Sequence, residues 1–190
     1  MKFFDVICCA AFVFAESCFA AEPLKPTVPT APATARTAVI GAETPIAPKI
    51  VADGSAVGDI QTASENIEVG KNASAGNLST VSGAVLIGPD SSVLSITTQI
   101  GAVSLGAGAM VVKDIVLEAG TVTIGKGALV MGRINVVRPP RGEKPTLRIM
   151  IEEGSAIQGG VMMGYPVQIC VAKNASAGRI SGGKALKCKP

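Results

Sequence analysis

The sequence contains no histidine and no tryptophan, and Tyr165 is its single tyrosine. Histidine is the side chain that proteins use most often as a general base and as a metal ligand, so its absence removes the usual routes to acid–base and zinc chemistry. The scarcity of aromatic side chains removes the stacking platforms on which proteins bind single-stranded nucleic acid. The formal charge is only +3, and the cations form no stripe. We therefore expect no metal, no cofactor and no nucleic-acid partner.

Carboxylates are the remaining candidates for acid–base chemistry, and they are spread along the chain rather than clustered. Glu152 and Glu153 are adjacent but precede Gly154, a context typical of a solvent-facing corner. Solenoid enzymes that cleave polysaccharides need carboxylates gathered on one face. The acidic residues that could form such a cluster fall in different repeats: Asp53, Asp59, Asp90, Asp114, Glu118, Glu152 and Glu153. The sequence predicts a protein that is not an enzyme.

The N-terminus has the pattern of a secretory signal. An apolar run at residues 6–15 follows Lys2, and the small residues Cys18 and Ala20 predict cleavage before Ala21. The run is shorter than the roughly 20 residues of a membrane-spanning helix. The alternative is a lipoprotein with Cys18 lipidated, although Glu16 lies where that pattern expects a small residue. We expect residues 1–20 to be removed and the chain to be exported, periplasmic or extracellular, with no transmembrane segment left.

Residues 21–49 are rich in proline, threonine and alanine, with prolines at about every third position in the first part. This composition favours a semi-extended polyproline II spacer, and a disordered leader is the alternative.

Two cysteines, Cys170 and Cys188, remain after the predicted cleavage. In an oxidising compartment an even pair predicts a disulfide, here one that would tie the C-terminal tail to the last repeat. The alternative is a pair of free thiols.

Pairs of apolar residues with one residue between them recur at nearly constant intervals, which is a strand signal. The pairs are Ile67/Val69, Val85/Ile87, Val103/Leu105, Val122/Ile124, Ile149/Ile151 and Ile169/Val171. Successive pairs are 18, 18, 19, 27 and 20 residues apart. The long interval contains a charged, proline-broken insertion at residues 138–145, and without those eight residues it returns to 19.

Each repeat has further apolar positions at fixed distances from its pair. The first comes nine or ten residues later, at Leu78, Ile96, Ile115, Ile134, Val161 and Ile180. The second comes at twelve, at Val81, Leu117, Val136 and Met163. We expect the apolar side chains at all these positions to point inward and to stack on their equivalents one rung away. Gly70, Gly88, Gly106 and Gly125 directly follow a pair, as expected at corners that need positive φ or leave no room for a side chain. The string at 71–76 recurs at 173–178.

A period near 18 with several short strands is typical of one coil of a β-solenoid. We predict an all-β parallel β-helix of six to seven rungs over residues 50–182, with a partial first rung at 50–60 and a basic tail at 183–190. The repeats at 54–60, 72–78, 127–134 and 174–180 resemble the rungs of bactofilins, bacterial polymer-forming proteins built on a right-handed parallel β-helix. That resemblance favours right-handed coiling. Apolar positions six residues apart, such as Leu105, Val111 and Leu117, leave the left-handed hexapeptide helix as the alternative.

Two functions follow from this fold. The first is an exported, non-catalytic scaffold or envelope component that self-associates through its terminal rungs, because unpaired strand edges can add strands from another chain. The alternative is a monomeric binding module that presents a solenoid face or the 138–145 loop to a glycan or a protein. Arg138, Arg141 and Lys144 are the candidate contacts in that loop.

Overall fold

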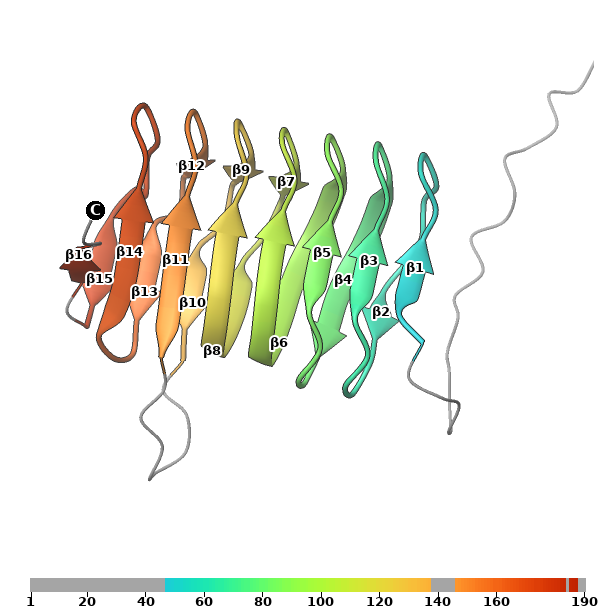
Figure 1. Cartoon of the computed structure of the whole chain (residues 1–190), viewed down its shortest axis with the longest axis horizontal. Coiled ribbons are helices and arrows are strands. Elements are labelled where there is room, and N and C mark those ends of the chain that lie inside the picture. The colour runs from blue at the N-terminus through green and yellow to red at the C-terminus, as the bar shows by residue number, and fades with distance from the viewer. Residues whose placement is uncertain (1–46, 138–145, 184, 188–190) are drawn as a thin grey trace, which may run out of the picture. The chain divides into compact units, whose positions relative to one another are not determined.

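The computed structural model describes residues 47–137, 146–183 and 185–187, and these form a parallel β-solenoid of about seven turns with no helix (Figure 1). The predicted fold class is therefore confirmed. In Figure 1 the turns stack side by side from β1 at the blue end to β14, β15 and β16 at the red end. The strand pairs all run parallel, and each turn contributes a strand or a bridge to three faces.

Face 1 is the sheet that contains the predicted apolar pairs. Its strands are β1 (Lys49–Val51), β3 (Ile67–Val69), β5 (Val85–Ile87), the end of β6 (Ser92–Leu105), the end of β8 (Ile115–Ile124), β11 (Leu147–Ile151), β14 (Val167–Val171) and β16 (Ala185–Lys187).

Face 2 is the shortest sheet and follows the corner after each face-1 strand. It consists of the start of β4 (Ser74–Thr80), the start of β6, β7 (Met110–Val111), β9 (Leu129–Val130) and β12 (Ala156–Ile157), with single bridges from Ala56 and Ser176 at its two ends.

Face 3 completes each turn. It consists of β2 (Ile60–Gln61), the end of β4, the middle of β6, the start of β8, β10 (Ile134–Val136), β13 (Val161–Met163) and β15 (Ile180–Gly182).

The core consists of apolar side chains that stack on their equivalents in the neighbouring turns. The predicted pairs lie in one register, with Ile67 opposite Val85 and Val85 opposite Val103. The column from Leu78 to Val161 on face 3 is also continuous and at most 1% exposed. Because stacked turns are about 4.8 Å apart, β-branched and other aliphatic side chains fill this narrow interior without aromatic rings.

The prediction that Val81 points into the core is wrong, because Val81 is 47% exposed. Leu117 lies in register with Thr98 and Thr80, so Thr80 holds the inward position. Three of the later turns have one more residue between faces 2 and 3: residues 94–95 join the two faces in an early turn, whereas residues 112–114, 131–133 and 158–160 join them in the next three turns. The last turn is again one residue shorter. A count from the apolar pair therefore differs by one residue between the shorter and the longer turns, and a one-residue shift moves a strand residue to the opposite face.

The corner between faces 1 and 2 repeats one backbone conformation in all seven turns, in the row of narrow loops at the top of Figure 1. Its third residue has a positive φ between 51° and 71° and is always glycine, asparagine or aspartate: Gly54, Asn72, Asp90, Gly108, Gly127, Gly154 and Asn174. These residue types tolerate the left-handed region best. Asn72 and Asn174 are thus corner residues, and this explains why the string at 71–76 recurs at 173–178.

The glycines that directly follow the apolar pairs are needed for a different reason. Their φ values are not in the left-handed region, but a Cβ on Gly88 would lie 2.6 Å from the backbone of Gly70, and one on Gly125 would lie 2.4 Å from the Leu105 carbonyl oxygen. Of the two reasons expected for these glycines, close approach of neighbouring turns is the one that applies.

Candidate assembly edges

The N-terminal end of the solenoid is formed by β1 on face 1, Ala56 on face 2 and β2 on face 3. Each pairs with the second turn only, so within the described residues its other side has no strand partner. The first turn contains one lysine, Lys49, and three carboxylates, Asp53, Asp59 and Glu65. This end of the molecule is acidic.

Asp59, a carboxylate of the first turn, is hydrogen-bonded to the second turn. Its Oδ1 accepts hydrogen bonds from the Asn77 backbone N–H at 2.8 Å and from Asn77 Nδ2 at 3.0 Å. Ser95 Oγ donates in turn to Asn77 Oδ1 at 2.6 Å. The two hydrogen bonds from Asn77, with a smaller contribution from the charge of Lys113, lower the pKa of Asp59, so this carboxylate stays ionised below the usual aspartate range.

The C-terminal end leaves part of the core uncovered. Val171 is 48% exposed and Ile180 is 40% exposed, whereas Ile151 and Val161, their partners one turn earlier, are 2% and 1% exposed. β15 has no partner on its outer side among the described strands. The last turn contains Lys173 and Arg179 and no carboxylate in residues 169–183. This end is basic and partly apolar.

β16 makes the two ends unequal. It pairs with β14 and adds an eighth strand to face 1, while face 3 has seven. It lies in the segment interpreted from the sequence as a basic tail. Lys187 is in register with Ile169, and Lys49 is in register with Ile67 at the other end of the same column. Charged residues on terminal strands are one way in which proteins restrain edge-to-edge pairing.

Cys170 is half-buried and directly follows Ile169, the last residue of β14 that pairs with β16. Cys188, its predicted partner, lies outside the described residues, so the disulfide stays a prediction.

The candidate contacts Arg138, Arg141 and Lys144 also lie outside the described residues. The flanking residues show where the insertion belongs: Val137 follows β10 on face 3, and Thr146 precedes β11 on face 1. The corner between those faces is therefore the part of the repeat that accepts extra residues. Thr146 also lines an open depression of about 480 Å³ beside Pro166 and Gln168.

Within the described ranges, no group of three or more cysteine, aspartate or glutamate side chains could hold a metal ion. The carboxylates considered for catalysis form no such group, and Glu152 and Glu153 are both exposed. The described part of the chain also contains no helix long and apolar enough to cross a membrane.

Comparisons with protein-family models, with curated proteins and with solved structures found no match.

Proposed function

We propose that the chain is a non-catalytic structural protein that associates end to end through the terminal turns of its solenoid. The observation that carries the proposal is the uncovered core at the C-terminal end, where Val171 and Ile180 are exposed although the interior turns bury the same positions. A further turn from a second copy would cover both side chains. The resemblance of the repeats to bactofilins supports the same function, and the predicted signal peptide favours an exported scaffold associated with the cell envelope.

The charges of the two ends favour a head-to-tail arrangement. The first turn has three carboxylates and one lysine, whereas the last turn has two cations and no carboxylate in residues 169–183. Contacts between unlike ends bring opposite charges together, while contacts between two C-terminal ends bring like charges together. A head-to-tail contact is heterologous and can repeat without closing, which produces filaments.

A gapless junction defines which strands meet. β2 of the second copy would pair with β15, and β1 of the second copy would pair with β14. The outer side of β14 is occupied by β16, so β16 must move away before the junction forms. Lys49 would then lie beside Ile169, which makes the junction weaker than an interior pairing. We therefore expect association only at high protein concentration.

A pair of matched substitutions tests the junction. Val171 and Val81 are 48% and 47% exposed, but Val171 is at the C-terminal end and Val81 is at a corner in the side of the solenoid. In sedimentation of the chain from Ala21, Val171→Lys should abolish concentration-dependent association, because it places a charge at the junction. Val81→Lys should leave association unchanged. Equal effects of the two variants would contradict an end-to-end junction.

A second candidate function is a monomeric binding module that presents one solenoid face to a glycan or a protein. It is favoured by Arg133 and Arg179, two exposed arginines on one side of the solenoid.

A further inference from the structure

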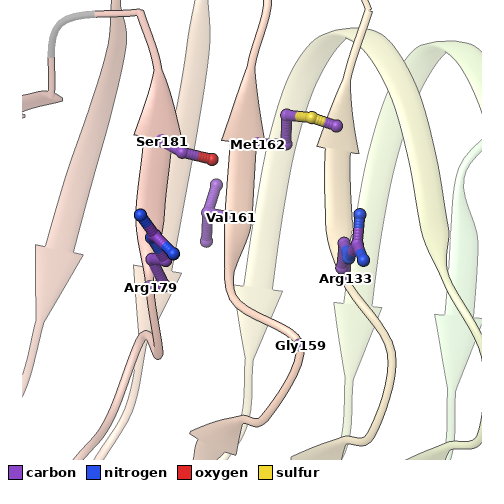
Figure 2. Close-up of a pocket in the computed structure, with 6 residues that line it drawn as sticks. All are labelled: Arg133, Gly159, Val161, Met162, Arg179 and Ser181. Atoms are coloured by element: carbon purple, nitrogen blue, oxygen red, sulfur yellow. The ribbon is translucent and has the colours of Figure 1, made fainter.

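Two arginines flank a depression of about 290 Å³ over the last turns of face 3. Figure 2 shows Arg133 at the start of one strand and Arg179 at the start of another, with Met162 and Val161 on the strand between them. Ile134 is in register with Val161 and Val161 with Ile180, so the residues before them, Arg133, Gly160 and Arg179, form one column. The two arginine backbones are thus two turns apart, or about 10 Å along the axis.

The space between the arginines exists because the intermediate turn carries two glycines. A Cβ on Gly160 would lie 2.2 Å from the Arg179 carbonyl oxygen, and a Cβ on Gly159 would lie 2.5 Å from the backbone of Gly132 and 2.8 Å from Arg133 Cγ. The close approach of the turns therefore excludes a side chain at either position. The arginines are left with an open gap between them instead of a third side chain.

The charges around the depression leave both guanidinium groups available. Neither arginine side chain forms an ion pair or hydrogen bond with another residue of the described ranges. Asp114, one turn before Arg133 in the same column, uses its Oδ1 to accept the Arg133 backbone N–H at 2.7 Å. Earlier in the column the residues are acidic or neutral, as in the hydrogen-bonded series Asp59, Asn77 and Ser95. The positively charged residues of this column therefore both lie in its later turns.

The floor of the depression combines apolar and polar atoms. Met162 is 39% exposed, and Ser181 on β15 adds a hydroxyl group at the rim. The site is an open trough along the solenoid axis rather than an enclosed cavity. An open trough suits a segment of a polymer. Within the described ranges no aromatic ring lies at the site for a base to stack on, since Tyr165 is buried in the core, and this disfavours single-stranded nucleic acid.

We propose that this trough binds an acidic polysaccharide, with two of its carboxylates paired to Arg133 and Arg179 and the sugar rings lying over Gly159, Gly160 and Met162. Arginine presents a planar fork of donors that matches a carboxylate in bidentate fashion. Both carboxylates belong to one stiff polymer chain. Once the first pair has formed, the second carboxylate is therefore at a high effective concentration beside its arginine, and the affinity for the polymer exceeds that for a single sugar. This binding does not depend on end-to-end association, because the trough is complete within one copy.

The probe is polygalacturonate, a polymer of carboxylated sugars, titrated into the chain from Ala21 by calorimetry, with dextran as the uncharged polymer and galacturonate as the single sugar. We expect polygalacturonate to bind, dextran not to bind, and galacturonate to bind at least tenfold more weakly than the polymer. Binding of dextran with equal affinity would overturn the proposal, as would the absence of polygalacturonate binding.

Variants then locate the site. Arg133→Gln and Arg179→Gln should each weaken binding about tenfold, the equivalent of one charge-assisted hydrogen-bonded pair. Arg148→Gln is the matched control, because Arg148 is an exposed arginine on face 1 and its loss changes the net charge equally. Unchanged melting temperatures would show that the variants fold. An equal loss of affinity in Arg148→Gln would mean that the polymer senses only net charge, and the proposed site would be wrong.

Discussion

At the scale of single residues, the solenoid depends on positions where a side chain cannot fit. Gly101 stacks between Gly83 and Gly120 at the corner between faces 3 and 1, and a Cβ on it would lie 2.3 Å from the Gly83 carbonyl oxygen. Gly58 is also a corner glycine, but a Cβ there would meet nothing within 4 Å. Both have φ values outside the left-handed region, so the two differ mainly in the space around them.

This difference predicts opposite effects of the same substitution. Gly101→Ala should lower the free energy of unfolding by about 1–3 kcal/mol or more, because neighbouring turns must move apart. Gly58→Ala should be neutral or should stabilise the protein by up to about 1 kcal/mol, since alanine restricts the unfolded chain. Denaturant unfolding of both variants measures the change. A stability loss of the same size at Gly58 would contradict the steric explanation.

Tyr165 is the one aromatic side chain in the core of the described residues. It lies in the corner between β13 and β14, is buried, and donates its phenolic hydrogen to the Glu118 carbonyl oxygen two turns earlier. The turn between them is the one that contains residues 138–145. A side chain long enough to reach across that turn, with a polar end that needs a partner, explains why a ring is used in an otherwise aliphatic core.

The pH dependence of this contact can be measured directly. Burial raises the pKa of the Tyr165 phenol above its ordinary value of 10.0, and the negative charge of Glu118 raises it further. The neutral form is therefore favoured in the folded state, so its stabilisation is complete below pH 10 and is lost as the pH rises through the folded pKa. Because the chain has one tyrosine, phenolate absorbance reports this residue alone, and it should appear at higher pH in the folded than in the denatured protein.

Tyr165→Phe provides the control for that titration. It should cost about 1 kcal/mol of stability at neutral pH through loss of the hydrogen bond, and it should reduce the loss of stability above pH 10. Identical titration of the folded and denatured wild-type protein would contradict burial of the phenol.

At the scale of elements, β16 decides how the C-terminal end behaves. It covers β14 on face 1, while β15 on face 3 stays uncovered. A chain that ends at Gly183 would lack this strand and expose the edge of β14. We predict that this variant associates at lower concentration than the form that keeps β16, and that reduction of the predicted Cys170–Cys188 disulfide acts in the same direction. Sedimentation velocity measures both. Weaker association of the truncated form would mean that β16 is part of the junction rather than a strand that blocks it.

The elements also show what could be predicted from the sequence. The apolar columns were predictable because stacked turns bring like side chains together, so that Ile67, Val85 and Val103 recur at one spacing. β16 was not predictable, because a three-residue strand with a lysine in register with the core positions has no apolar pattern. Val81 was wrongly predicted to lie in the core, because the number of residues between an apolar pair and the inward positions of face 3 depends on the length of the corner, which the strand pattern does not reveal.

The trough on face 3 could not be predicted from the sequence, for a related reason. Arg133 and Arg179 are 46 residues apart, and the turn that separates them includes the insertion at 138–145. Only the pairing of β10 with β13 and of β13 with β15 places the two arginines in one column. The two glycines at 159 and 160 were the one available signal, since they mark a corner without side chains.

At the scale of the whole molecule, the solenoid is a stack of similar turns whose two ends differ. Each interior turn pairs its strands and covers its apolar side chains against a turn on either side. The two ends keep unpaired strand edges, the uncovered side chains Val171 and Ile180, and charges of opposite sign, and these are available for contacts with a second copy. The stability of such a stack is a sum over neighbouring turns. Adding a second copy therefore extends the same interactions that hold the monomer together, and this is the physical basis of the proposed assembly.

The most direct test is sedimentation of the chain from Ala21, over a wide range of concentrations, with negative-stain imaging of the same samples. End-to-end association predicts a sedimentation coefficient that rises with concentration and rods whose lengths are multiples of one solenoid. A single species at every concentration, with images of isolated solenoids only, would contradict it.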